Sequence, residues 1–207
     1  MTYNIQPLFS TPILEGQIGR DITSIESEFV EIQKLDATRN TGNSRSRSSR
    51  ILDMEEMKDI RSFIEQQINN YVCGVLCLPP QLDLYVTQSW LNYTEPGEYH
   101  HLHRHPNSFI SGVFYFNADG ESDKLVFDKQ TSLLDDTFVV HPVAYNIFNS
   151  RSWWLSANTG KLFIFPSKLY HKVDTTTSKE TRISLSFNTF FHGVLGDESS
   201  LTELILE

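Results

Sequence analysis

The sequence predicts an α+β protein, mainly β, in which helices come first and a β-sandwich or barrel follows. In the first third of the chain, apolar residues recur at every third or fourth position, which is the helical period. From Gln81 onward, apolar and polar residues alternate in short segments rich in β-branched and aromatic side chains. Because no linker-like segment separates the two parts, we expect one domain over 1–207, with a mostly helical elaboration at 1–80 and the β core at 81–195.

Two helices are expected before residue 80. The first covers Asp21–Leu35, and its apolar residues share one face. The second covers Asp53–Leu76; Asp53 can cap its N-terminus, and Pro79 cannot continue it. The apolar stripe of the second helix includes Ile60, Ile64 and Ile68. We expect both helices to pack on the convex face of the β core as support.

Seven strands are expected after residue 80, separated by turn-forming residues such as Asp119-Gly120. They are Leu84–Asn92, Phe109–Asn117, Lys124–Phe127, Thr137–Val140, Ala144–Phe148, Lys161–Phe165 and Arg182–Phe191. The acidic stretch after Gly196 is expected to be a short surface segment.

Composition excludes several classes of protein. Of the 207 residues, 39% are hydrophobic and 12% aromatic, which excludes a wholly disordered chain. The net charge of −9 argues against a general affinity for nucleic acid. No apolar run is long enough to span a membrane, and the N-terminus does not have the pattern of a signal peptide.

The two cysteines, Cys73 and Cys77, cannot form a disulfide framework. Their spacing predicts two small buried thiols on one face of a helix. A reducing cytoplasm is therefore the expected location, or the host cytoplasm if the protein is virally encoded.

One local segment departs from the acidic average. Three arginines, Arg45, Arg47 and Arg50, lie among serines and close to Gly42. We favour a solvated loop here over an anion-binding segment, because such short arginine clusters are weak signals.

Histidines indicate where chemistry could occur. Four of the seven lie within six residues: His100, His101, His103 and His105. In an extended segment alternate side chains share a face, so we expect His101, His103 and His105 together and His100 pointing away. An H-x-H pair at the mouth of a strand favours a metal site, and His171, after the strand at 161–165, is the expected third ligand.

A carboxylate seat is expected beside this metal. Arg182 opens the strand that follows His171, and Ser184 shares its face. A metal with an arginine and a serine nearby suits a carboxylate that also contacts the metal. The alternative is a surface ion pair of Arg182 with Glu180. Tyr115 is either a donor to this carboxylate or a core aromatic residue; both interpretations are open.

The order of these motifs resembles the 2-oxoglutarate- and Fe(II)-dependent oxygenases. Gly97-Glu98-Tyr99 followed by His103-x-His105 is similar to the first metal motif of the prolyl-hydroxylase-like members. The strand at 160–165, His171, Val173 and Arg182-x-Ser184 is similar to the second. The resemblance covers about residues 85–190. Four segments resemble a phage and bacterial branch of this superfamily: Trp90-x-Asn92, His103 to Ser108, Ser111 to Tyr115 and Phe165-Pro166-Ser167.

The resemblance implies a double-stranded β-helix, or jelly roll, with the metal inside its open end. It implies that 2-oxoglutarate chelates Fe(II), that Arg182 pairs with the distal carboxylate, and that Ser184 supports this pair. With O2, such an enzyme couples the decarboxylation of 2-oxoglutarate to the oxidation of a substrate. Hydroxylation is the expected type of oxidation. No catalytic residue beyond the metal site is expected.

One departure from the family pattern concerns position 105, where the family usually has an aspartate or glutamate. His105 can ligate the metal itself, which we favour because imidazole suits iron. It can instead lie behind the ligands, with a water or halide in the open position. A carboxylate such as Asp128 can also complete the metal site.

Two functions from different classes remain at this point. The first is the iron- and 2-oxoglutarate-dependent dioxygenase. The second is a non-oxidative metal-binding cupin, namely a zinc- or manganese-type hydrolase, isomerase or sensor. The substrate of the oxygenase is open, a peptidyl side chain or a small metabolite, and neither a membrane nor a nucleic acid is an expected partner.

Overall fold

The computed structural model describes residues 2–20, 26–33, 35–130 and 141–206. Two α-helices lie in the first third: α1 (Glu26–Gln33) and α2 (Lys58–Asn69). Twelve strands occur in the described residues: β1 (Leu14–Gln17), β2 (Ala37–Arg39), β3 (Ser44–Ser46), β4 (Asp83–Thr94), β5 (His100–His103), β6 (Ile110–Asn117), β7 (Lys124–Asp128), β8 (Ser152–Ser156), β9 (Lys161–Pro166), β10 (Tyr170–Val173), β11 (Arg182–Leu195) and β12 (Leu204–Leu206).

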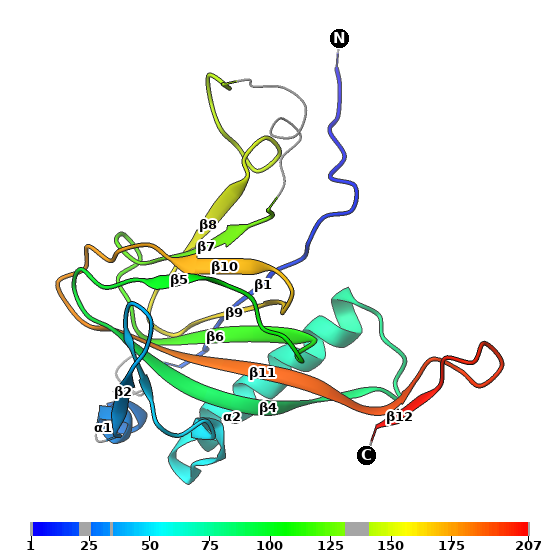
Figure 1. Cartoon of the computed structure of the whole chain (residues 1–207), viewed down its shortest axis with the longest axis horizontal. Helices are drawn as coiled ribbons and strands as arrows, with labels where there is room; N and C mark the ends of the chain where they lie inside the picture. Colours follow the sequence, from blue (N-terminus) through cyan, green and yellow to red (C-terminus); the bar gives the residue numbers. More distant parts are fainter. Residues whose placement is uncertain (1, 21–25, 34, 131–140, 207) are drawn as a thin grey trace.

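The strands form two antiparallel sheets that face each other (Figure 1). The large sheet has the order β1-β9-β6-β11-β4-β3-β2, with β12 paired to the far end of β11. The small sheet has the order β5-β10-β7-β8. This is the jelly-roll architecture with N-terminal supporting helices that the sequence and its resemblance predicted.

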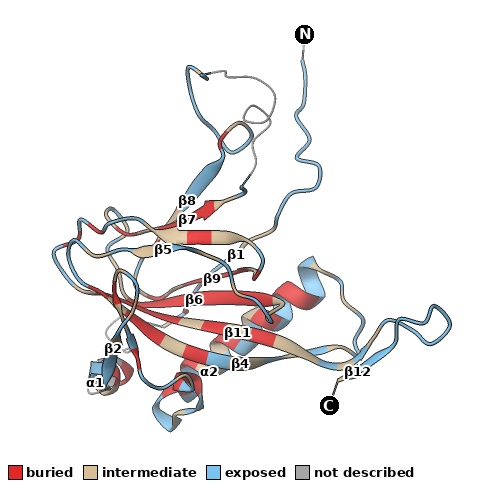
Figure 2. Ribbon diagram, in the orientation of Figure 1, coloured by how far each residue is buried: buried red, intermediate tan, exposed pale blue. Residues whose placement is uncertain are grey.

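Alternation along the central strands builds two cores. The first lies on the outer face of the large sheet and joins it to α2. Its members include Ile60, Ile64 and Ile68 of α2 with Leu162, Ile164, Leu185 and Phe187 of the sheet. The second lies between the sheets and contains Val113, Tyr115, Leu125, Phe127, Phe163 and Phe165. Figure 2 shows this burial concentrated in the central strands and on the sheet-facing side of α2.

The helices therefore serve as support, as predicted, although their starts differ. Residues 21–25 lie outside the described part, and α1 covers Glu26–Gln33. The prediction that Asp53 caps the second helix is wrong: α2 begins at Lys58, and no side chain caps it. Asp53 lies in a preceding 3₁₀ turn and instead pairs with Arg61 at 2.8 Å. A π-helical turn at Asn70–Val75 extends α2.

Cys73 and Cys77 are exposed, so the prediction of buried thiols is wrong. Cys73 lies in the π-helical turn after α2, next to the buried Val72 but itself on the solvent side, and Cys77 follows this turn. In addition, Cys77 has a positive φ of 51°, which takes it out of the helical face.

The predicted strand at Ala144–Phe148 is also wrong. The segment is an exposed turn in which the Asn146 carboxamide accepts the backbone N–H of Phe148 at 2.8 Å. Such local bonds compete with strand pairing, and within the described part of the chain the alternating apolar residues have no partner strand. The neighbouring strand is β8, which pairs with β7 and carries Trp153 and Trp154 half-exposed. The strand predicted at Thr137–Val140 lies outside the described residues.

Other expected strands are confirmed, and short ones are added. The segment with Arg45 is not simply a loop, because Ser44–Ser46 forms β3 against β4.

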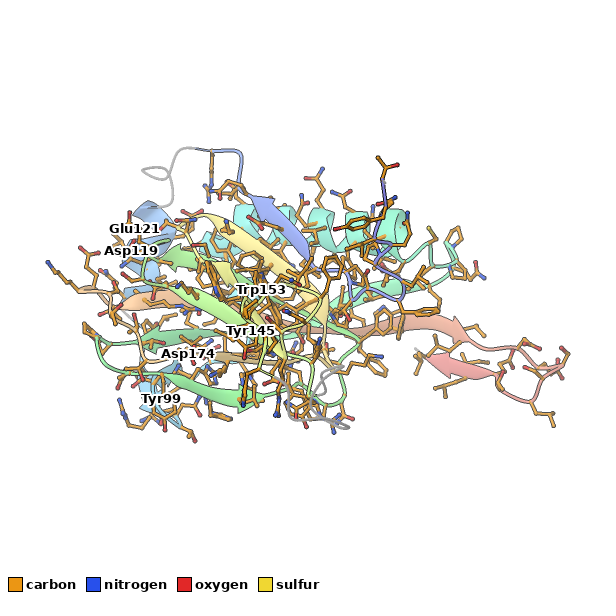
Figure 3. The ribbon with its side chains drawn as sticks, turned by 90° about the horizontal axis from the view of Figure 1, so that it is seen from above. Tyr99, Asp119, Glu121, Tyr145, Trp153 and Asp174 are labelled. Atoms are coloured by element: carbon orange, nitrogen blue, oxygen red, sulfur yellow. The ribbon has the colours of Figure 1, made fainter. Side chains whose placement is uncertain are left out.

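Figure 3 looks down on both layers, with Trp153 and Tyr145 near the centre and four residues toward one end: Tyr99, Asp119, Glu121 and Asp174. Among the described residues, no helix is long and apolar enough to cross a membrane.

Candidate metal centre

Three histidines meet between the sheets. His103 at the end of β5 is the direct partner of His171 on β10. His105 follows β5, and one ligand atom from each of His103, His105 and His171 lies within 4.8 Å of the others. We call these three residues the histidine triad. The structure thus brings together the three residues that the sequence proposed as ligands.

Several contacts hold His105, which lies in the loop after β5. The backbone N–H of His105 donates to the carbonyl of Ser167 at 3.0 Å. The Ser167 hydroxyl, fully buried, donates to Ser108 at 2.8 Å and lies 2.7 Å from that of Ser111. On the large sheet, the Trp90 ring stacks on the His105 ring with centroids 5.6 Å apart. His105 is therefore held by residues of the large sheet and of the turn that follows β9.

Backbone carbonyls set the orientation of the other two rings. The Nδ1 of His103 lies 2.8 Å from the carbonyl of His101, and the Nδ1 of His171 lies 3.0 Å from that of Leu169. A carbonyl only accepts, so each Nδ1 carries the ring proton and each Nε2 keeps a free lone pair. This is the usual way in which a protein presents an imidazole to a metal.

The donor set fits a divalent transition-metal ion. Nε2 of His105 lies 3.2 Å from Nε2 of His171. Two nitrogens bound at right angles to one metal, each at about 2.1 Å, lie about 3 Å apart. Burial lowers the pKa of His105 to about 4, and burial together with the nearby His103 and His105 lowers the pKa of His171 well below its usual value. Both rings are thus neutral at pH 7, as metal binding requires.

Asp128 gives no support as a substitute ligand. It lies on β7 opposite Tyr170, and its carboxylate accepts the backbone N–H of Gln130 at 2.7 Å and pairs with Arg151 at 3.5 Å. Among the described residues, the groups that could hold a metal do not include it. The geometry favours His105 as the third donor.

The prediction that His101 joins the triad face while His100 points away is wrong. His101 is exposed, and His100 lines the cavity of the triad. The cause is a bulge: His103 pairs with His171, but His100 pairs with Val173, so three steps on β5 match two on β10. Alternation therefore fails between residues 100 and 103, and His100 stacks on His103 with ring centroids 4.5 Å apart.

Arg182 lies in the same cavity and is 2% exposed. It donates to the Tyr115 hydroxyl at 3.0 Å and to the carbonyl of Lys124 at 3.2 Å. Among the described residues, no carboxylate lies within ion-pair distance of it; Glu180 instead accepts from Asn117 at 3.5 Å. The expected alternative of an Arg182–Glu180 pair is therefore wrong. A buried cation without a counter-charge indicates an anionic ligand.

Tyr115 is a core aromatic residue whose hydroxyl also faces Arg182, so it has features of both interpretations that the sequence left open. Its ring is fully buried in the core between the sheets, and its hydroxyl accepts from Arg182. Ser184 lies two residues after Arg182 and lines the cavity. In the part of the chain that the structure describes, its hydroxyl has no hydrogen-bond partner, so it is free for a ligand.

The cavity is narrow, about 40 Å³, and runs from the histidine triad to Arg182. Its apolar walls include Val113, Leu125 and Phe165. Asn92 of β4 also lines it, is 4% exposed, and has a buried Oδ1 without a hydrogen-bond partner among the described residues. Sequence reasoning gave no role to Asn92 or His100. Asn92 could have been assigned to the cavity by pairing it with Ser184 across β4 and β11. His100 could not, because the bulge in β5 changes the face on which it lies.

Two facing antiparallel sheets form a jelly roll, and one cavity holds a histidine triad that could bind a metal ion and a buried arginine that could meet an anion. Comparison with known proteins agrees with this arrangement. Residues 88–188 match the sequence model of a family described as "Putative 2OG-Fe(II) oxygenase". No curated protein matches the chain.

Solved structures share the fold. A 2OG-Fe(II) oxygenase family protein from Burkholderia pseudomallei has 12% identity and a TM-score of 0.57, over 86% of this chain and 83% of that one. HygX from Streptomyces hygroscopicus, with nickel, 2-oxoglutarate and hygromycin B bound, has 12% identity and a TM-score of 0.60 over 86% and 82%. A prolyl-4-hydroxylase from Pseudomonas putida has 15% identity and a TM-score of 0.54 over 89% and 94%.

The resemblance seen in the sequence is thus confirmed: residues 88–188 match the model of a 2-oxoglutarate- and Fe(II)-dependent oxygenase family, and solved structures of such oxygenases share the fold. The enzymes of this family use Fe(II), 2-oxoglutarate and O2. The match at 88–188 includes the triad, His100, Arg182 and Ser184.

Proposed function

We propose that His103, His105 and His171 hold Fe(II) in this chain, and that Arg182, Ser184 and Tyr115 seat the distal carboxylate of 2-oxoglutarate. The observation that carries the proposal is the buried Arg182, which has no carboxylate partner among the described residues and shares a narrow cavity with the triad. A dicarboxylate that also binds the metal satisfies both ends of this cavity. Bound Fe(II) and 2-oxoglutarate supply the oxidising power: with O2 they convert a substrate C–H to C–OH, with succinate and carbon dioxide as products.

Each residue has a separate task in this arrangement. The Tyr115 hydroxyl and the Lys124 carbonyl fix the guanidinium of Arg182, which then offers its remaining N–H groups to a carboxylate in a planar fork. The Ser184 hydroxyl donates beside it. Val113, Leu125 and Phe165 surround the methylene part of the cosubstrate and exclude water.

Three neutral imidazoles have an electrostatic consequence. A histidine face leaves the full charge of a divalent ion uncompensated, whereas an aspartate at position 105 would cancel part of it. An anionic chelating ligand such as a keto acid is therefore attracted more strongly. Together with Arg182, the metal makes the cavity electropositive at both ends.

The direct test is anaerobic purification followed by metal analysis and addition of 2-oxoglutarate. We expect about one iron per chain, a metal-to-ligand absorption band on addition of 2-oxoglutarate, and release of succinate when O2 is admitted. A protein that binds zinc in preference to iron and develops no band would contradict the proposal and favour a non-oxidative metal cupin.

The arrangement restricts the direction from which a substrate can approach, but it does not identify the substrate. The cavity itself is filled by the cosubstrate, so the substrate must approach the metal from outside it. A peptidyl side chain and a small metabolite both remain candidates, with neither a membrane nor a nucleic acid as an expected partner. The cytoplasmic location stays a prediction.

A further inference from the structure

His100 occupies a position that the triad and Arg182 leave unexplained. The bulge in β5 turns His100 and His103 to the same side of the small sheet. The His100 ring stacks on that of His103 at an interplanar angle of 13°. It also lines the same cavity as Arg182. His100 therefore lies along the path from the metal end of the cavity to the arginine end.

Polar atoms on both walls of this path lack partners. Within the described residues, neither ring nitrogen of His100 makes a hydrogen bond. On the opposite wall, Asn92 donates to the Ser186 hydroxyl at 3.0 Å, but its buried Oδ1 has no partner. Buried polar groups are nearly always hydrogen-bonded, and leaving one unpaired costs about 1–3 kcal/mol. This part of the cavity is thus built around a polar ligand.

We propose that His100 is a further cosubstrate-binding residue, whose ring N–H donates to the carboxylate at the keto-acid end of 2-oxoglutarate. The inference rests on the proposed function. The two ends of the cosubstrate then have different partners: Arg182, Ser184 and Tyr115 hold the distal carboxylate, and His100, next to His103, holds the carboxylate beside the metal. A neutral imidazole has one N–H to donate and one lone pair, which suits this task.

A second metal ion is the competing explanation. Ligand atoms of His100, His101 and His103 also lie within 4.8 Å of one another. However, Nδ1 of His103 faces the His101 carbonyl at 2.8 Å, so that ring has one lone pair to give, and the triad already uses it. Both groups cannot bind metal at once.

The test compares two keto acids that differ at the distal end. 2-Oxoglutarate has a distal carboxylate, and 2-oxobutyrate does not. Binding of each to the full-length, Fe(II)-loaded protein is titrated anaerobically through the metal-to-ligand absorption band. The variants are His100→Leu, His100→Gln and Arg182→Gln, with the exposed neighbour His101→Leu as the matched control.

We expect His100→Leu to weaken both keto acids by about 10-fold, the scale of one hydrogen bond to a charged group. His100→Gln, whose amide also donates, should lose less, and His101→Leu should match the wild type. Arg182→Gln should weaken 2-oxoglutarate and leave 2-oxobutyrate unchanged. Iron should stay at one per chain in the wild type and in both His100 variants.

Three results would overturn the assignment of His100. These are unchanged keto-acid affinity in His100→Leu, equal losses in His100→Leu and His100→Gln, and two irons per wild-type chain that fall to one in both His100→Leu and His101→Leu. A wild-type protein that binds iron but neither keto acid would overturn the proposed function itself, and the role of His100 with it.

Discussion

At the scale of single residues, the site depends on which face of a strand each side chain occupies. Along β11, Ile183, Leu185 and Phe187 are buried in the core shared with α2. Arg182 and Ser184 point the other way, into the cavity. The same strand thus contributes to the core with one face and to the proposed ligand seat with the other, and substitutions on its two faces should have separable effects.

His103 and His171 are expected to be required for iron binding. They are direct partners across β5 and β10, and each presents a free Nε2. Alanine at either position leaves two donors, too few to hold a divalent ion in this cavity. We expect loss of stoichiometric iron by metal analysis with retention of the fold by circular dichroism, and unchanged iron in His101→Ala. Iron affinities equal to wild type in both variants would show that the metal lies elsewhere.

His105 distinguishes the three interpretations of the third ligand. His105→Ala should lower iron affinity by at least about 10–100-fold, the scale of losing even a supporting residue of a metal site. His105→Asp should retain iron, because it restores a two-histidine, one-carboxylate face. Asp128→Asn is the control, and competition with a chelator is the measurement. If Asp128→Asn loses iron and His105→Ala keeps it, the assignment must be reversed.

Arg182→Gln should weaken 2-oxoglutarate binding by about 10–150-fold, which corresponds to about 1.5–3 kcal/mol for a hydrogen-bonded charge. Iron affinity should stay nearly unchanged, because Arg182 contacts Tyr115 and Lys124 rather than the triad. Lys179→Gln, an exposed position, controls for the loss of one positive charge. An anaerobic titration that gives wild-type affinity for Arg182→Gln would exclude it as the carboxylate anchor.

These residues could be found from the sequence because spacing carried the information. His103-x-His105 is a same-face pair, and Arg182-x-Ser184 is another. His100 could not be placed in this way, because one extra residue in a strand reverses the face of everything before it. The bulge is visible only once β5 is paired with β10.

At the scale of elements, α2 is support for the sheet. Ile64 is fully buried between α2 and the large sheet, on the face opposite the cavity. Ile64→Ala should lower the free energy of unfolding by about 2–5 kcal/mol. Affinity for 2-oxoglutarate should not change in the folded protein. Chemical denaturation measures the first quantity and anaerobic titration the second.

The exposed Gln66→Ala on the same helix is the control and should leave stability within about 0.5 kcal/mol. A large loss of cosubstrate affinity in Ile64→Ala at unchanged stability would mean that α2 takes part in the site.

At this scale, strands with apolar sequences were predicted and short polar strands were not, for a physical reason. β6 and β9 are buried on both faces and read as nearly continuous apolar runs, whereas β4 and β11 are long and partly alternate, so all four give a clear signal. β5 and β10 have four residues each and polar sequences, and they are strands only because they pair with each other and with β7. Conversely, residues 144–148 alternate between apolar and polar but pair with no strand that the structure describes, and a turn held by Asn146 forms there instead.

At the scale of the whole molecule, the proposed ligands join the two sheets. His103 and His171 belong to the small sheet, whereas Arg182 and Ser184 belong to the large one. A metal and a cosubstrate that bridge these residues bind only the folded chain. They should therefore add their binding free energy to its stability.

We expect the melting temperature to rise in two steps. A metal or cosubstrate at 100 times its dissociation constant adds about 2.7 kcal/mol. For a chain of this size, each kcal/mol raises the melting temperature by about 2–4 °C, so each step should be roughly 5–11 °C. Thermal denaturation with Ni²⁺ alone, and then with Ni²⁺ and 2-oxoglutarate, measures both steps, and a chelator should remove both.

Two variants test whether both steps come from the proposed site between the sheets. His171→Ala should lose both steps, because 2-oxoglutarate depends on the metal. Arg182→Gln should keep the metal step and lose about half or more of the second, because its cosubstrate affinity is reduced while its triad is intact. A 2-oxoglutarate step that persists in the chelated protein, or that is undiminished in Arg182→Gln, would place the dicarboxylate outside the cavity between the sheets.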